Sequence, residues 1–187
     1  MKKELILALR FTLVTTLVFG LIYPLVVTGL SKMLFPKQAA GSLIEKNGRV
    51  VGSKLIGQSF SADKYFHSRP SAAGNGYDAS ASNPSNLAPT NQALIDRVKS
   101  DVAKLQQENP GVPIPTDLVT ASGSGLDPEI SPAAAEFQIP RIAKARSMSV
   151  DSVRALVARH RQARTIGIFG EPRVNVLELN LDLDSLK

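Results

Sequence analysis

Few side chains in this chain are suited to acid–base or metal chemistry. There are two histidines, His67 and His160, far apart in the sequence, and there is no cysteine. Thiolate ligands, disulfides and cysteine nucleophiles are therefore excluded. No carboxylate stands at motif spacing from either histidine to complete a zinc site. The sequence predicts no catalytic metal centre.

The serine- and glycine-rich segment 122–125, which reads SGSG, is the best candidate for other chemistry. Ser124 with His160 and Asp127 would form a hydrolase triad, but Ser122 stands where a nucleophile elbow has its first glycine. The glycines could instead expose backbone N–H groups to a phosphate, although the lysine and hydroxyl of a P-loop are missing. A plain tight turn is the third reading.

Two further clusters could recognise a partner. The aromatic and basic run YFHSRP at 65–70 could be a fixed recognition loop or a hydrophobic cluster beneath a long loop. Between 141 and 164 there are seven basic residues and one acid, Asp151. Such a run is typical of a solvated helix face, but Arg141, Lys144 and Arg146 could also dock an acidic partner or lipid headgroups.

The element that must position these residues is a membrane anchor. No charged residue lies between Arg10 and Lys32, and segment 11–30 supplies about 30 Å of helix, the thickness of a bilayer's hydrocarbon core. The apolar run is longer than that of a usual cleaved signal peptide, and the residues after it, LFPK at 34–37 and then QAA at 38–40, match a small-residue cleavage site poorly. The basic residues before the span favour a cytoplasmic N-terminus and an extracytoplasmic domain, and those after it weaken this bias.

The predicted span carries small or compact residues at every fourth position: Thr12, Thr16, Gly20, Pro24 and Thr28. Residues four apart lie along one side of a helix, and small residues let a second membrane helix approach closely. We therefore expect a partner helix in the membrane, although an anchor that merely tolerates these residues is the alternative. Pro24 should bend the helix.

The remainder predicts a small α+β domain, so that 1–36 is the anchor and 37–187 the extracytoplasmic domain. Its first element is a hairpin at 42–51 around Asn47-Gly48, with a return strand that continues to 56. A long loop follows at 57–90, of a length that is usually functional or disordered. Periodic apolar residues then predict a helix at 91–108, capped by Thr90.

The C-terminal half should contain an extended segment at 112–120, two helices and a strand. One helix begins after Ser131, breaks at Pro140 and continues to 146, and the next runs from Ser149 to 162. Leucines alternate with polar residues over 173–183, which predicts a strand with one buried face. The net charge of +6 could indicate nucleic acid, but a membrane anchor favours lipid or an acidic protein surface, and we expect no nucleic acid.

Seven segments, in order and spread over most of the chain, resemble the C subunit of the bacterial Kdp-type potassium-transporting ATPase (the KdpC family). They are YPL (23–25), LIGQSF (55–60), YFHSRPSA (65–72), SNLAPTN (85–91), DLVTASGSGLDP (117–128), QIPRIAKAR (138–146) and GEPRVNVLELNL (170–181).

The resemblance implies an accessory, non-catalytic subunit of a high-affinity potassium import complex in the bacterial inner membrane. Its expected partners are a channel-like subunit and a P-type ATPase subunit, beside membrane lipid. The family's C subunit is described as a catalytic chaperone that supports assembly and raises the ATPase subunit's affinity for ATP. No tightly bound cofactor is implied. The residues tied to nucleotide in the family match Ser122, Gly123, Ser124, Gly125 and Gln138.

Direct contact with ATP conflicts with the expected topology, because a domain outside the cytoplasm cannot reach cytoplasmic nucleotide. Contact with the extracellular mouth of the channel-like subunit is the interpretation we prefer. Two alternatives from other classes remain: a membrane-anchored extracytoplasmic serine hydrolase that uses Ser124, and an anchored module that binds lipid or polymer.

Overall fold

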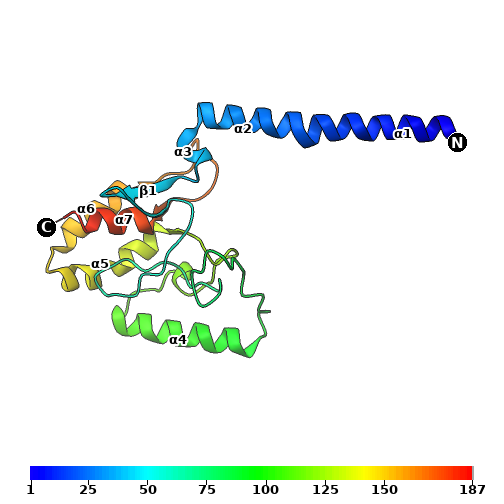
Figure 1. The fold of residues 1–187 in the computed structure, drawn as a ribbon. Coiled ribbons are helices and arrows are strands. Elements are labelled where there is room, and N and C mark those ends of the chain that lie inside the picture. The colour runs from blue at the N-terminus through cyan, green and yellow to red at the C-terminus, as the bar shows by residue number, and fades with distance from the viewer. Residues whose placement is uncertain (187) are drawn as a thin grey trace. The chain divides into compact units, whose positions relative to one another are not determined.

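The computed structural model describes residues 1–186 and divides into two compact units, one of residues 1–51 and one that begins at Gly52. Figure 1 shows the order of the elements along the chain. The fold is α+β, as predicted: one apolar N-terminal helix precedes a small domain of helices and short strands. Each unit is described separately below.

The first unit begins with a continuous helical segment, Lys2–Leu34, long and apolar enough to cross a membrane. It comprises α1 (Lys2–Thr15), a π-helical stretch η1 (Thr16–Ile22) and α2 (Tyr23–Leu34). The helix therefore extends beyond the predicted span 11–30 at both ends. Its apolar side chains are exposed along the whole length, as expected of a surface that faces lipid or another helix.

The expected bend at Pro24 is replaced by the π-helical stretch that ends two residues earlier. Proline has no N–H to donate, and a turn with i→i+5 bonding, such as Tyr23 N–H to the Val18 carbonyl, absorbs the irregularity. Figure 1 shows the helix continuing without a sharp bend.

The π-helical stretch also affects the row of small residues. In an α-helix, four residues overshoot a 3.6-residue turn, so a row spaced by four drifts around the axis. In the wider π turn four residues fall short of a full turn, so the drift is partly reversed between Thr16 and Gly20. The geometry therefore keeps the row more nearly on one side of the helix.

After the short helix α3 (Pro36–Ala39), the predicted hairpin forms from β1 (Leu43–Lys46) and β2 (Arg49–Ser53). Asn47 and Gly48 both have positive φ, +54° and +72°, as a two-residue type I′ turn requires. The return strand ends at Ser53 rather than at 56, because Leu55 donates its N–H to the Ser53 hydroxyl within a turn.

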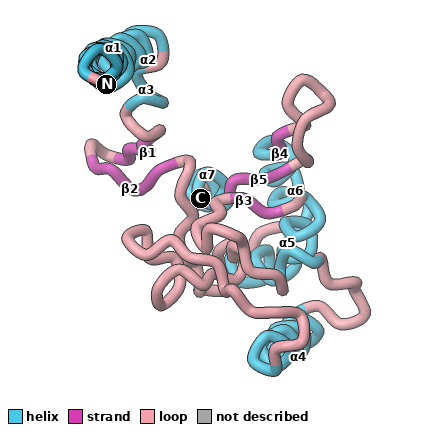
Figure 2. The backbone as a smooth tube through the Cα atoms, turned by 90° about the vertical axis from the view of Figure 1, so that its right-hand side faces the viewer, coloured by secondary structure: helices cyan, strands magenta, loops and turns pink. Residues whose placement is uncertain are grey.

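The second unit is built around a three-stranded antiparallel sheet with the order β3–β5–β4 (Figure 2). The strands are β3 (Glu129–Ile130), β5 (Arg173–Asn175) and β4 (Arg161–Gln162), and Val174 pairs with both neighbours. The helices α5 (Pro132–Arg146), α6 (Val150–His160) and α7 (Val176–Leu183) bury one common core against this sheet.

Helix α5 runs without the break expected at Pro140. The residues on both sides of the proline, Phe137 and Ile139 before it and Ile142 after it, are buried, whereas Pro140 lies on the exposed face. A proline inside a helix costs about 3 kcal/mol, and burial of these neighbours offsets that cost. The expected caps of α5 and α6 are confirmed: Ser131 accepts from Ala134 N–H, and Ser149 from Ser152 N–H.

The predicted C-terminal strand is wrong beyond its first three residues, because the chain forms α7 from Val176. Asn175 caps this helix through Glu178 N–H. Residues 176, 179, 180 and 183 are all buried, which is the spacing of one helix face. Because Asn180 is polar, the sequence pattern placed it on the exposed side, and the leucines around it were interpreted as one face of a strand.

Helix α4 (Gln92–Glu108) matches the prediction, although Asn91 and not Thr90 is the cap. It has no fully buried residue, and Figures 1 and 2 show it along one side of the unit, where its last residue, Glu108, pairs with Arg141 of α5. The segment expected to be extended contains a short 3₁₀ turn, Thr116–Leu118. The long loop 57–90 has no helix or strand.

Candidate functional site

The backbone of five consecutive loop residues, 63–67, is held by side chains of α5 and α7. Each of these residues gives at least one N–H or carbonyl group to a hydrogen bond with one of four side chains, here called the loop clamp: Gln138, Arg141, Arg146 and Asn180. A loop cannot satisfy its own backbone as a helix or sheet does, so these side chains act in place of a neighbouring strand.

Gln138, a candidate nucleotide-related residue, is 2% exposed and lies in the middle of the clamp. Its Oε1 accepts from His67 N–H at 2.7 Å and from Arg141 Nη2 at 2.8 Å. Its Nε2 donates to the carbonyls of His67 at 3.1 Å and Ala134 at 3.2 Å. The four hydrogen bonds use the full capacity of an amide group. In this structure Gln138 fixes the loop.

Asn180 repeats this arrangement one residue earlier in the loop. Its Oδ1 accepts from Phe66 N–H at 2.9 Å, and its Nδ2 donates to the Phe66 carbonyl at 3.0 Å. Asn180 is 2% exposed, and the Phe66 ring is fully buried in the core. The run YFHSRP is thus a hydrophobic cluster under a long loop, with Phe66 as its anchor.

The two arginines of the clamp are committed to the chain itself. Arg141 pairs with Glu108 at 2.8 Å and donates to the carbonyls of Asp63 and Tyr65. Arg146 donates to the Lys64 carbonyl at 2.7 Å, and its guanidinium lies 5.1 Å from the centre of the Tyr65 ring.

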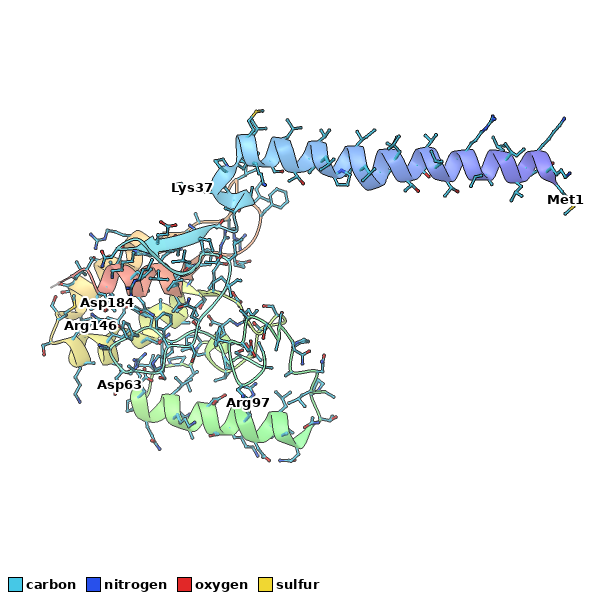
Figure 3. All side chains as sticks on the ribbon, viewed as in Figure 1. Met1, Lys37, Asp63, Arg97, Arg146 and Asp184 are labelled. Carbon is cyan, nitrogen blue, oxygen red and sulfur yellow. The ribbon has the colours of Figure 1, made fainter. Side chains whose placement is uncertain are left out.

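Arg146 also closes the end of α7, where it forms an ion pair with Asp184 at 2.6 Å (Figure 3). Only 10% of the Arg141 side chain and 14% of the Arg146 side chain are exposed. Of the three residues expected to form a docking surface, Lys144 alone is exposed. A docking role for the group stays a prediction.

The segment 122–125 lies under the same long loop, as a shelf to which the loop is attached. Three successive carbonyls, those of Ser124, Gly125 and Leu126, accept hydrogen bonds from it. The bonds run from Asn83 N–H (3.1 Å) and Ser82 Oγ (2.9 Å) to Ser124, from Ser71 Oγ to Gly125, and from Gly57 N–H (2.8 Å) to Leu126.

Gly125 is required at this shelf for two reasons. Its φ is +68°, and a Cβ there would lie 2.7 Å from Ala73 N and 2.8 Å from the Asn83 carbonyl oxygen. By contrast, a Cβ at Gly123 would meet nothing within 4 Å. The two glycines of the motif therefore differ: one is fixed by close packing of the loop, and the other is an exposed turn residue.

A phosphate nest needs free backbone N–H groups, and two N–H groups of this region already donate hydrogen bonds within the chain. Gly125 N–H donates to the Ser122 carbonyl at 3.3 Å, and Leu126 N–H to Ser124 Oγ at 3.1 Å. Ser122 is 5% exposed, and its Oγ has no hydrogen-bond partner within residues 1–186. Gly123 and Ser124 are exposed, so a nucleotide role for 122–125 stays a prediction.

The residues of the alternative hydrolase triad are not joined to one another. His160 Nε2 lies 2.8 Å from Asp182 Oδ2, and Asp127 Oδ2 accepts from Arg69 Nη1 at 2.9 Å. Over the described part of the chain, no hydrogen bond connects Ser124, His160 and Asp127. Within the same residues, no group of three or more His, Asp or Glu side chains could hold a metal ion.

Two clefts border the attached loop. One, of about 580 Å³, lies against α4 and is lined by residues that include His67, Arg69 and Gln138. The other, of about 820 Å³, has four carboxylates and two guanidinium groups in its lining. Three of the carboxylates are ion-paired, Glu171 with Arg164 outside the lining, so that Asp117 leaves an excess of one negative charge, which disfavours a nucleotide in the larger cleft. Its charged residues are Asp117, Asp127, Glu129, Glu171, Arg69 and Arg173.

Burial shifts the pKa of two groups beside the smaller cleft. Desolvation, with a contribution from the charge of Arg141, lowers the pKa of His67 below its ordinary value of 6.5. Desolvation raises the pKa of Tyr77 to about 12. The Tyr77 hydroxyl donates to the Arg69 carbonyl at 2.6 Å, so it serves as a fixed donor that holds the loop.

Sequence reasoning missed Asn180, which bears as directly on the site as Gln138. A polar residue inside a leucine-rich stretch was read as the solvent side of a strand. The signal that could have found it is the pair Asn175 and Glu178, three positions apart, which is a helix-start pattern. Once α7 is a helix, Asn180 joins the buried face.

Fold and site together define a membrane-anchored α+β protein whose buried amides and arginines hold a long loop against its core. Comparison with known proteins narrows this class. A family model described as KdpC, the K⁺-transporting ATPase c chain, matches residues 5–185. The chain belongs to this family.

Known relatives are similar to this chain along nearly its whole length. The potassium-transporting ATPase KdpC subunit of Koribacter versatilis is 59% identical over 98% of this chain and 95% of the relative. The subunit of the same name from Methylobacterium nodulans is 57% identical over 100% and 96%. That of Rhodopseudomonas palustris is 56% identical over the full length of both.

Proposed function

We propose that this chain is an accessory, non-catalytic subunit of a potassium-import ATPase in the bacterial inner membrane. Its helix Lys2–Leu34 seats it beside a channel-like subunit, and its domain stands outside the cytoplasm. The observation that carries the proposal is the family match over 5–185, which spans the membrane helix and the domain together.

A non-catalytic role is supported by the use to which the polar residues are put. The side chains that could do acid–base or nucleotide chemistry hold the loop or pair with one another. Gln138 makes four hydrogen bonds within the chain, and His160 and Asp127 each have a partner outside the triad. This pattern favours a rigid surface for a partner over an active site.

The chain raises the partner ATPase's affinity for ATP indirectly, through its contact with the membrane partners, and holds no ATP tightly itself. Two features support an indirect effect: the saturated amide of Gln138 and the surplus of carboxylates in the larger cleft. A subunit that stabilises the ATP-competent state of its partner raises the apparent affinity without touching the nucleotide.

The row of small residues in the helix is the proposed packing surface within the membrane. The π-helical stretch keeps Thr16 and Gly20 near one side, and small residues allow close approach of a second helix. Gly20→Leu leaves insertion intact and lowers the yield of the purified complex. Gly29→Leu, outside the row, is the matched control. Equal yields of the two variants would leave the helix as a tether only.

Topology can be tested cleanly because the natural chain has no cysteine. Val112 in the domain is 43% exposed and Leu5 before the predicted span is 71% exposed, so both positions suit a single cysteine substitution. A membrane-impermeant maleimide on intact spheroplasts labels Val112→Cys, whereas Leu5→Cys reacts only after permeabilisation. The opposite pattern would place the domain in the cytoplasm and reinstate direct nucleotide contact.

The functional test is the potassium-stimulated ATPase activity of the complex purified with and without this chain. Omission should abolish assembly or raise the KM for ATP, and addition of the chain should restore both. Full activity and an unchanged KM in its absence would contradict the accessory role. Labelling by a serine-reactive probe, abolished by Ser124→Ala, would support the hydrolase instead.

A further inference from the structure

The loop that joins β4 to β5, residues 163–172, projects from the domain as an irregular hairpin (Figure 2). Thr165 and Phe169 close it through two hydrogen bonds: Thr165 N–H to the Phe169 carbonyl at 2.8 Å, and Phe169 N–H to the Thr165 carbonyl at 3.0 Å. The end of this hairpin carries three apolar side chains, here called the apolar tip: Ile166, Ile168 and Phe169.

The apolar tip is open to solvent to a degree that is unusual for such residues. Ile166 is 83% exposed, Ile168 72% and Phe169 65%. Ile166 also has a φ of +55°, a conformation that β-branched residues rarely adopt. Glycine or asparagine would suit this turn better. The sequence therefore keeps a bulky apolar side chain at a strained, exposed position, which points to an interaction surface.

Basic residues precede the apolar tip in the sequence, at the end of α6, in β4 and in the hairpin itself. Arg159, Arg161 and Arg164 are all exposed, and no acidic residue occurs from 152 to 170. The nearest acid in the sequence, Glu171, is neutralised by a bidentate pair with Arg164, at 2.7 and 2.8 Å. Exposed apolar side chains with exposed arginines close to them in the sequence fit a surface that has an apolar interior and anionic headgroups.

The size of the apolar tip favours a bilayer over a separate protein. A stable protein–protein interface usually buries about 800 Å² on each partner, far more than three side chains supply. A membrane contact needs less, because the anchor already holds the domain at the bilayer. Residues 35–51 join the helix to the second unit and reach at most about 60 Å when fully extended.

We propose that the apolar tip inserts into the interfacial region of an anionic bilayer, with Arg159 and Arg161 on the headgroups. The domain then has a second, reversible attachment to the membrane besides its helix. This contact would restrict the orientation of the domain relative to the bilayer. It involves lipid only, and it stands apart from the proposed contacts with partner subunits.

The chain has no tryptophan, so Phe169→Trp introduces a single tryptophan at the apolar tip, which can be excited apart from the tyrosines. The full-length chain is reconstituted through its own helix into vesicles of phosphatidylcholine and phosphatidylglycerol. Lipids brominated on their acyl chains should quench Phe169→Trp about twofold or more. Val112→Trp, in an exposed loop of the same unit, is the matched control and should respond to aqueous acrylamide but little to bromolipid.

Reversing the charge of two arginines tests the proposed headgroup contact independently. Arg159→Glu with Arg161→Glu, in the Phe169→Trp background, should weaken the lipid contact by at least about fivefold for each residue and restore access to acrylamide. Vesicles of phosphatidylcholine alone, which lack anionic headgroups, should likewise weaken the contact of the apolar tip with lipid. Equal bromolipid quenching of the apolar-tip and control probes would overturn the proposal. So would an apolar-tip probe that is shielded only in the assembled complex and insensitive to lipid, which would indicate a protein partner.

Discussion

Replacement of Gln138 by methionine tests whether this residue holds the loop or serves a nucleotide. The two side chains are similar in length, so Gln138→Met preserves packing and removes only hydrogen bonds. The His67 N–H and carbonyl, bound at 2.7 and 3.1 Å, lose their partners. Each unsatisfied group costs about 1–3 kcal/mol, and partial access of water to His67 places the total near 3 kcal/mol.

The effect can be measured by thermal unfolding of the full-length chain in detergent, followed by circular dichroism at 222 nm. For a domain of this size, 1 kcal/mol corresponds to about 2–4 °C, so the midpoint should fall by about 6–12 °C. Gln107→Met, on the exposed side of α4, is the matched control and should shift the midpoint by less than about 2 °C.

The two explanations of Gln138 give different results in a second assay. If the residue belongs to the loop clamp, any change in the complex's KM for ATP should follow the loss of stability and disappear at lower temperature. An unchanged midpoint together with a raised KM would refute the structural reasoning and favour a nucleotide contact.

Three further substitutions test other parts of the site. Gly125→Ala should lower the free energy of unfolding in urea by about 2–4 kcal/mol, because of strain at φ +68° and contact with Ala73. Gly123→Ala, the control, should lower it by less than about 0.5 kcal/mol. Equal losses would contradict the close packing of the loop against Gly125. Burial lowers the pKa of His67 below 6.5, so the imidazole binds a proton more readily in the unfolded chain than in the folded one. The stability that neutral His67 contributes is therefore complete above pH 6.5, and it is lost as the pH falls from 6.5 toward the lowered pKa of the folded chain. His67→Gln should flatten this dependence in unfolding measured from pH 7.5 to 5, and an unchanged slope would exclude His67 as its source. Asn175→Ala should cost about 1–2 kcal/mol and reduce helix content, since it removes the cap of α7; a loss of stability with full helix content would assign its effect to the bond with the Lys54 carbonyl instead.

Local signals in the sequence predicted the elements that depend on nearest neighbours. The type I′ turn at Asn47-Gly48 requires only two residues that tolerate positive φ. The caps at Ser131 and Ser149 each require one hydroxyl at the right spacing from an N–H group. The membrane helix follows from length and lack of charge, which need no tertiary context.

The predictions that failed are those in which tertiary packing outweighs local preference. Pro140 sits inside α5 because buried residues flank it on both sides. The leucines after Asn175 lie in a helix, because Asn180 is buried where it can bind both backbone groups of Phe66. A sequence pattern treats asparagine as a surface residue, and only the position of the loop makes a buried amide favourable.

The sequence by itself determined the class of this protein: an apolar segment long enough to cross a membrane, a basic charge balance that favours lipid or an acidic protein surface, and a set of motifs that resembles one family. The tertiary structure decided what the motif residues do, because hydrogen bonds between segments distant in the chain depend on the fold. Only the fold brings Gln138 and Asn180 to a loop about 70 and 114 positions away in sequence. Only the fold places Ile166 at the exposed end of a hairpin, where a short apolar run becomes a surface.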